Sequence, residues 1–362
     1  MDHRLSSCRG CLLGLAVGDA MGYTVDPKTW ADIRLSYGPN GLLGYDLVNG
    51  RAEASSYTQI AAYIANGLLI GTTRGKQEQY PKYMNMAVKE WARRQNLPRD
   101  PAKDNCWVSR IPQLRRRHCR DSRMLDALRA ENLGTPENPI NKADSPGSIT
   151  AAMMVGLAYD PKYMQALAVG FLGARAVAMT HGDPETFLCG AVVAFLMAGL
   201  LQEPGGALKA HFENAVDAMV HFFADRWTEA TTLAAKLKAV VENIDPEENH
   251  QLKMEQLRCI TTAECLAGAV YAACVCNDDF DRAMILAVNH SGRSAAVGAM
   301  TGAILGAQMG VEALPDFYLE CLEVKEVLNV LAQDLAQGSP TSGLFDDDWD
   351  LKYTQATPVG NF

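Results

Sequence analysis

The chain has 362 residues, 48% of them hydrophobic and 21% charged, which is the composition of an ordinary globular protein with a sizeable core. Its net charge of −9 argues against nucleic acid as the main partner, because binding to a phosphate backbone depends on clustered positive charge. The first residues contain no apolar run ending in a small-residue cleavage site, so no secretion signal is indicated and a cytoplasmic location is expected.

Helical periodicity runs through almost the whole chain, and proline-rich segments are its main interruptions. Helices are expected at about 56–71, 79–94, 161–180, 206–222, 228–243, 262–276, 279–289, 294–309 and 316–336. Only Leu42 to Val48 has a weak strand pattern, and the links 97–112 and 134–147 are typical of ordered surface loops. We therefore predict one compact multi-helix, all-α domain over residues 1–362, with a partly irregular and solvated acidic tail at 337–362.

Local sequence marks two helix starts. Asp183-Pro184-Glu185 has an N-cap residue, a proline and an acid in the order of a helix opening, and Ser145-Pro146-Gly147-Ser148 is similar. The free N–H groups at such openings suit anions. The apolar stretch from Thr186 to Gln202 is too short and too closely flanked by glutamates for a membrane span, so we expect a buried helix and no membrane partner.

A basic segment contains Arg110 and the run from Arg115 to Arg120. Such a run is usually a solvated surface, and a site for phosphate or an acidic protein partner is the alternative. The ten cysteines lie scattered in helix-like sequence, which indicates reduced thiols rather than a disulfide framework. Cys8 and Cys11 form a lone C-x-x-C pair, which does not indicate a zinc site.

Glycines recur every four residues at positions 298, 302, 306 and 310. This period places them on one helix face, where the missing side chains let a neighbouring backbone approach closely. We therefore expect this helix in the middle of the core.

Common nucleotide and hydrolase motifs are missing from the sequence. The run from Gly71 to Gln77 has one residue too few between its glycines for a P-loop, and Gln77 stands where a Ser or Thr is needed. No G-x-S-x-G or H-E-x-x-H occurs, so serine-hydrolase and zincin functions have no supporting motif.

Three segments taken together resemble motifs of the ADP-ribosylglycohydrolase family. They are Gly10 to Gly22, Thr180 to Pro184, and Asn289 to Ala296, and the similarity is colinear over roughly residues 8 to 336. The resemblance implies an all-helical fold. In typical members it also implies two magnesium ions, which orient ribose hydroxyls and a water to cleave the bond between ADP-ribose and a protein side chain or related acceptor.

The carboxylates that hold those metals in the family are replaced in this chain. The family's early T-D-D-T motif aligns with Ser55-Ser56-Tyr57-Thr58, and its late G-D-x-D-T motif aligns with Gly292-Arg293-Ser294-Ala295-Ala296. An arginine about 5 Å from a divalent cation would be repelled by about 6 kcal/mol at an effective dielectric near 20. Only Asp19, Glu53 and Asp26, which takes the place of a family glutamate, remain nearby, so no metal cofactor is expected.

Ligand contacts implied by the resemblance survive in part. The family's diphosphate-binding segment aligns with Gly147 to Ile149, and His181 matches an imidazole that lies near the ribose; a hydrogen-bonded histidine at a helix end is the open alternative for His181. Arg293 is hypothesised to project into the former metal pocket as a fixed cation, partnered by Glu53, Asp26 or an anionic ligand. The predicted ligand-binding residues are Ser55, Ser56, Thr58, Gly147, Ser148, Ile149, His181, Arg293 and Ser294.

Three functions remain open from the sequence. The first is a metal-free pseudoenzyme that binds ADP-ribose, another nucleotide or an ADP-ribosylated protein in the old cleft. The second is an active hydrolase of an ADP-ribosyl or related glycosidic bond, in which Arg293 lowers the pKa of Tyr57 so that Tyr57 and Asp26 serve as catalytic acid and base. The third is a scaffold or interaction protein that kept only the fold. The sequence indicates no oligomeric state.

Overall fold

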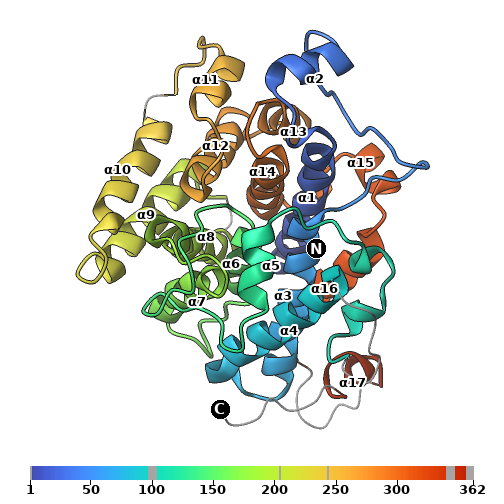
Figure 1. Ribbon diagram of the computed structural model, residues 1–362, viewed down its shortest axis with the longest axis vertical. Coiled ribbons are helices and arrows are strands. Elements are labelled where there is room, and N and C mark those ends of the chain that lie inside the picture. The colour runs from blue at the N-terminus through green and yellow to red at the C-terminus, as the bar shows by residue number, and fades with distance from the viewer. Residues whose placement is uncertain (1, 97–103, 204, 243, 340–346, 356–362) are drawn as a thin grey trace.

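Two glycine-rich helices from opposite ends of the chain, α1 (His3–Val25) and α14 (Ser294–Met309), pack side by side and antiparallel (Figure 1). The structure is a computed structural model that describes residues 2–96, 104–203, 205–242, 244–339 and 347–355. Along this pair, a Cβ added to a glycine of either helix would lie 1.9–2.3 Å from the carbonyl oxygen of the facing glycine. The facing pairs are Gly10 with Gly306, Gly14 with Gly302, and Gly18 with Gly298. The predicted close approach is thus confirmed for three of the four glycines, whereas Gly310 ends α14 with a φ of 82°.

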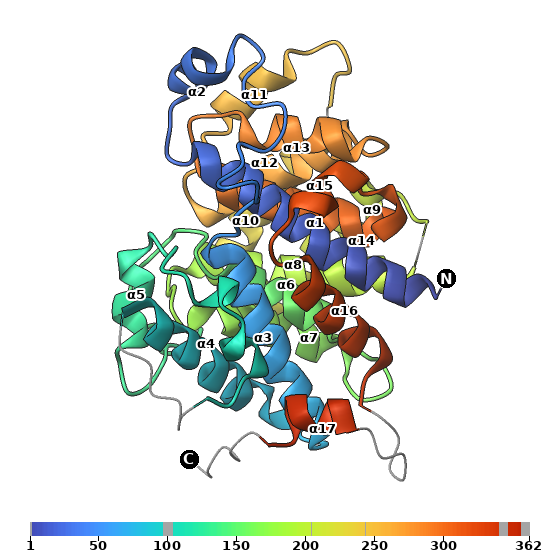
Figure 2. The ribbon, with the colours of Figure 1, turned by 90° about the vertical axis from the view of Figure 1, so that its right-hand side faces the viewer.

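The remaining helices surround this pair and complete an all-α fold, as predicted. In chain order the other α-helices are α2 (Trp30–Tyr37), α3 (Ser56–Thr73), α4 (Tyr80–Asn96), α5 (Ser122–Leu128), α6 (Ile149–Leu157), α7 (Ala166–Ala178), α8 (Pro184–Gln202), α9 (Leu208–Phe223), α10 (Glu229–Glu242), α11 (His250–Gln256), α12 (Thr262–Val275), α13 (Phe280–Val288), α15 (Asp316–Cys321), α16 (Lys325–Gln337) and α17 (Asp347–Tyr353). Short 3₁₀ helices are η1 (Gln77–Gln79), η3 (Trp107–Arg110), η4 (Gln113–Arg115) and η5 (Val311–Ala313). In both views α2 and α11 lie at one end of the molecule and α17 lies at the other (Figure 2).

Two local predictions about secondary structure are wrong. The segment from Leu42 to Val48 is not a strand: at one end the Leu42 N–H donates to Asn289 Oδ1 at 2.8 Å and Asn289 Nδ2 donates to the Leu42 carbonyl at 2.9 Å, and at the other end Val48 forms only an isolated bridge with Arg51. The helix expected over 316–336 is divided into α15 and α16. At the break, the Ala52 backbone pairs with Cys321 and Glu323 and takes the groups that would have continued the helix.

The predicted start of α8 is confirmed, because the Asp183 side chain accepts a hydrogen bond from the Thr186 N–H at 3.0 Å and Pro184 occupies the first turn. Within the described residues, α8 is the one helix long and apolar enough to cross a membrane, but 78% of its most apolar window is buried inside the fold. The helix expected to open at residues 145–148 is present, but its start has no side-chain cap. Helix α6 begins at Ile149, and Ser148 makes no side-chain cap.

All ten cysteines are free thiols, as predicted.

The C-terminal helix α17 packs against the rest of the fold. Trp349 Nε1 donates to Thr73 Oγ1 at 3.0 Å, and Asp334 accepts from Lys352 and Tyr353 at 2.7 and 2.6 Å. The acidic run around Trp349 is therefore docked over its described part, and residues 340–346 and 356–362 lie outside the described residues.

Candidate functional site

Several helix ends meet at one pocket with a volume of about 150 Å³. The C-terminal end of α1 contributes Tyr23 and Asp26, and the N-cap residues of α3 and α14, Ser55 and Arg293, also line the pocket. Helix N-termini carry partial positive charge and unpaired N–H groups. Asp19 accepts the N–H groups of Ser55 and Thr58 at the start of α3, and Asp26 accepts that of Ala295 in α14. The half-buried guanidinium of Arg293 is therefore the group in the pocket that favours an anion.

The structure brings six of the predicted site residues together and leaves five out of the pocket. Those that line it are Asp26, Ser55, Ser56, Tyr57, Gly147 and Arg293. Those that do not are Thr58, Ser148, Ile149, His181 and Ser294, all of which are buried. The five excluded residues can act on a ligand only through other groups.

Asp19 accepts hydrogen bonds from the first turn of α3 and does not line the pocket. Its carboxylate is fully buried and accepts four hydrogen bonds, from the N–H and hydroxyl of Ser55 at 2.9 and 2.5 Å and from those of Thr58 at 3.1 and 2.6 Å. Burial raises the pKa of Asp19, and these hydrogen bonds oppose that rise. With both oxygens occupied, Asp19 is a structural cap for α3.

The pocket does not fit the two magnesium ions that the family resemblance implies. All four positions that carry aspartate in the family motifs line the pocket as neutral or cationic groups: Ser56, Tyr57, Arg293 and Ala295. A divalent cation beside Arg293 would be repelled rather than held. Among the described residues no group of three or more His, Cys, Asp or Glu side chains is arranged to hold a metal ion.

Arg293 is half-buried and faces Asp26 across the end of the central helix pair. Burial raises the pKa of the Asp26 carboxyl, while the charges of Arg293 and Arg120 and the backbone N–H of Ala295 partly offset that rise. Glu53, another partner considered for Arg293, instead pairs with Arg116 at 2.6 Å. Arg293 thus acts on Asp26 through its charge, without an ion pair within 4.0 Å.

The expectation that Arg293 lowers the pKa of Tyr57 is wrong. Burial and the negative charge of Asp26 raise the pKa of the Tyr57 phenol well above its usual range, and Arg293 offsets only part of this. Desolvation penalises the phenolate, and that penalty exceeds the attraction of one cation. Tyr57 therefore stays a neutral phenol and is a poor catalytic base.

The basic segment is a solvated surface only in part, because Arg110, Arg117 and Arg120 are exposed while its other members are half-buried and bonded. Arg115 donates to the carbonyls of Ser109 and Arg110, and Arg116 pairs with Glu53 and Glu323 at 2.6 and 2.7 Å. The ring of His118 lies 2.7 Å from the Ala54 carbonyl, and both His118 and Arg120 line the pocket. Sequence reasoning missed this because the carboxylates that hold the segment are distant in the chain.

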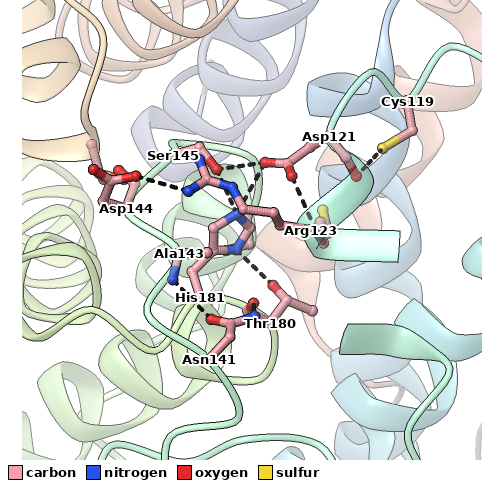
Figure 3. A network of polar contacts seen from close by, with 12 residues as sticks. Cys119, Asp121, Arg123, Asn141, Ala143, Asp144, Ser145, Thr180 and His181 are labelled. Atoms are coloured by element: carbon pink, nitrogen blue, oxygen red, sulfur yellow. Dashed lines mark hydrogen bonds and ion pairs between the residues drawn. The ribbon is translucent and has the colours of Figure 1, made fainter. Parts of the chain in front are cut away.

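A second group missed by sequence reasoning is Asp121, which lines the pocket and contacts His181 (Figure 3). Asp121 Oδ2 lies 3.2 Å from His181 Nε2 and accepts from the Ser145 hydroxyl at 2.5 Å. Burial alone would raise the pKa of Asp121, but the hydrogen bond and charge of His181, together with Ser145 and the Met124 N–H, hold it well below its usual value. Only the N-cap position of Asp121 before α5 could have drawn attention to it.

The Ser145, His181 and Asp121 group is not a hydrolytic triad. Asp121 and Ser145 both meet the same ring nitrogen of His181, Nε2, whereas a triad needs the acid on the opposite nitrogen from the serine. The other nitrogen, Nδ1, faces the buried hydroxyls of Ser148 and Thr180 at 2.9 and 2.8 Å. His181 is thus a hydrogen-bonded histidine behind the pocket wall, and it orients Asp121 and Ser145 at the surface of the pocket.

The loop that carries Arg293 is held by a neutral histidine, His290. Gly292 N–H donates to His290 Nδ1 at 3.0 Å, and His290 Nε2 lies 2.9 Å from the Ala287 carbonyl. Because a backbone N–H only donates and a carbonyl only accepts, Nδ1 is unprotonated and Nε2 carries the proton. Burial lowers the pKa of His290 to about 4.

We expect His290 to make the folded protein less stable in mild acid. The unfolded chain protonates His290 below about pH 6.5 and the folded protein only near pH 4, so the free energy of unfolding falls by about 2 kcal/mol from pH 7.5 to pH 5 through this residue. His290→Gln retains one donor and one acceptor without titrating. Urea unfolding of both proteins at the two pH values measures the difference, and equal pH dependence would contradict the assignment.

Comparisons with known proteins agree with this architecture. A family model described as ADP-ribosylglycohydrolase matches residues 1–344. Among solved structures, the chain is similar to one described as an "ADP-ribosylglycohydrolase-related protein complex", with a TM-score of 0.60 and 23% identity over 93% of this chain and 99% of that chain. At that identity the likeness shows a shared fold alone. No curated protein matches the chain.

Proposed function

Because the chain belongs to the ADP-ribosylglycohydrolase family, we propose that it is a metal-free pseudoenzyme that binds an ADP-ribose-like ligand in the pocket. The observation that carries this proposal is Arg293, which lines the pocket at the N-terminus of α14. A half-buried guanidinium binds phosphate or carboxylate oxygens with charge-assisted hydrogen bonds. The ligand is ADP-ribose, a related nucleotide or an ADP-ribosylated protein.

The size of the pocket limits which part of such a ligand enters it. A volume of about 150 Å³ is that of a cavity which admits one benzene-sized ring, whereas sites for whole drug-sized ligands span roughly 300–1,000 Å³. One sugar ring with an attached oxyanion fits inside. The remainder of a nucleotide would lie across the rim, where Arg120 and Arg123 are exposed.

The side chains of the pocket support binding better than the family's metal-assisted cleavage. Serine, tyrosine and arginine replace carboxylates that would have to offset the charge of two divalent cations. Tyr57 does not supply an alternative base, because burial raises the pKa of its phenol. We therefore propose retention and recognition of the ligand rather than its turnover.

One observation favours a hydrolase with altered chemistry as the second candidate. Two carboxyl groups line the pocket in contrasting environments: the pKa of Asp26 is raised by burial, and that of Asp121 is lowered by His181 and Ser145 despite burial. Such a divergence is how one site provides a catalytic acid and a carboxylate base. Release of ADP-ribose from an ADP-ribosylated protein in the presence of a chelator would favour this candidate over the pseudoenzyme.

No comparable observation supports the scaffold function. The cytoplasmic location stays a prediction.

Calorimetric titration of ADP-ribose tests the proposed function. We expect wild-type protein to bind with equal affinity in magnesium and in a chelator, and Arg293→Gln to weaken binding at least about tenfold, because a hydrogen-bonded charge is lost. Arg129→Gln is the matched control, since Arg129 lies on the surface paired with Asp126 and does not line the pocket. Absence of binding, or binding only with magnesium, would refute the proposal.

A further inference from the structure

The guanidinium of Arg120 is held between the Tyr23 ring and the Asp26 backbone at the rim of the pocket. Its central carbon lies 4.2 Å from the centroid of the Tyr23 ring, and its Nη1 donates to the backbone carbonyl of Asp26. Tyr23 in turn stacks on His118, with ring centroids 5.2 Å apart and the ring planes inclined by 30°. An arginine held by a ring face and by a carbonyl has little freedom to rotate, although its side chain is exposed.

The three stacked groups differ in what they present to a ligand. Tyr23 and His118 are half-buried and contact each other, whereas Arg120 is the exposed member of the stack. The central carbon of the Arg120 guanidinium lies over the Tyr23 ring, so the side of the guanidinium that points away from Tyr23, its outer face, is the surface that the stack offers. All three residues line the same pocket as Arg293.

We propose that the outer face of Arg120 stacks on the base of a nucleotide-type ligand whose sugar end occupies the pocket. This inference rests on the proposed function, and it names the part of the ligand that the pocket is too small to enclose. A planar, delocalised guanidinium stacks on an aromatic ring, and every nucleobase has such a face. Lysine carries the same charge without a planar face, so it separates stacking from electrostatic attraction.

Calorimetry with two ligands tests this inference. ADP-ribose and ribose 5-phosphate are titrated into wild-type protein, Arg120→Lys and Arg117→Lys. Arg117 is an exposed arginine of the same segment that does not line the pocket, so Arg117→Lys is the matched control. Thermal unfolding of each variant shows whether the fold is retained.

For Arg120→Lys we expect ADP-ribose to bind about tenfold more weakly, with ribose 5-phosphate affinity unchanged within about twofold, because only the first ligand has a base. Equal losses for both ligands would assign Arg120 a charge or folding role and overturn the inference. Unchanged ADP-ribose affinity would overturn it too, while leaving the proposed function intact. If wild-type protein binds neither ligand, the proposed function and this inference both fail.

Discussion

Gly302→Ala is expected to destabilise the protein by about 3 kcal/mol or more, because the added methyl group has no space in the central helix pair. A Cβ at this position would lie 2.0 Å from the carbonyl oxygen of Gly14 and 2.6 Å from its carbonyl carbon. Both atoms belong to the backbone of α1, so no side-chain rotation relieves the overlap. Urea unfolding followed by far-UV circular dichroism measures the loss.

Gly199→Ala is the matched control for this prediction. Gly199 lies in α8, where an added Cβ would meet nothing closer than His211 Nδ1 at 3.5 Å. Alanine at that position should leave the free energy of unfolding within about 1 kcal/mol of wild type, in the stabilising direction, because alanine favours helices over glycine. If both variants unfold at the same urea concentration as wild type, the close approach of α1 and α14 is incorrect.

The helix pair matters for the pocket as well as for stability. Asp26 caps the C-terminal end of α1 and Arg293 caps the N-terminal end of α14, so the register of the two helices brings these charges together. The interlocked glycines fix that register, since a shift would place side chains where backbone atoms now meet. Ligand affinity should therefore fall in any folded Gly302 variant.

Placing four aspartates at the family's motif positions is expected to create a magnesium dependence, which we do not expect in the wild-type protein. The variant carries Ser56→Asp, Tyr57→Asp, Arg293→Asp and Ala295→Asp, the positions that hold aspartates in the family motifs. Without metal, the four added carboxylates repel one another and Asp26, which should lower the stability of the variant below that of wild type. Magnesium at about 100 times its dissociation constant should then raise the free energy of unfolding by about 3 kcal/mol.

Thermal unfolding with and without magnesium measures this effect, and titration calorimetry counts the ions bound. The control carries asparagine at the same four positions, which keeps the size of the side chains and removes their charge. Wild-type protein and the asparagine variant should show no response to magnesium. A folded aspartate variant that ignores magnesium would mean that these positions do not converge on one metal pocket.

Much of the fold follows from periodicity in the sequence. Most of the long helices, the cap at Asp183 and the glycine face of α14 were predictable because local spacing determines which side chains share a helix face. The longest helix, α1, was not among the predicted ranges. Short helices such as α2, α5 and α11, with seven or eight residues each, were not predicted, because so few residues show little periodicity. The break between α15 and α16 was missed because Ala52, far away in the chain, takes the backbone hydrogen bonds there.

The candidate site, like the fold, was predictable from the sequence only in part. The sequence by itself determined which side chains are present, and therefore that Arg293, Ser56 and Tyr57 cannot provide the carboxylates that two magnesium ions need. Only the tertiary structure decided that Asp121, 60 residues away from His181, contacts it at the pocket. The tertiary structure also decided that the pKa of Tyr57 is raised rather than lowered. The physical reason is that desolvation and ion pairing depend on what covers a side chain, and those groups come from distant parts of the chain that local spacing does not specify.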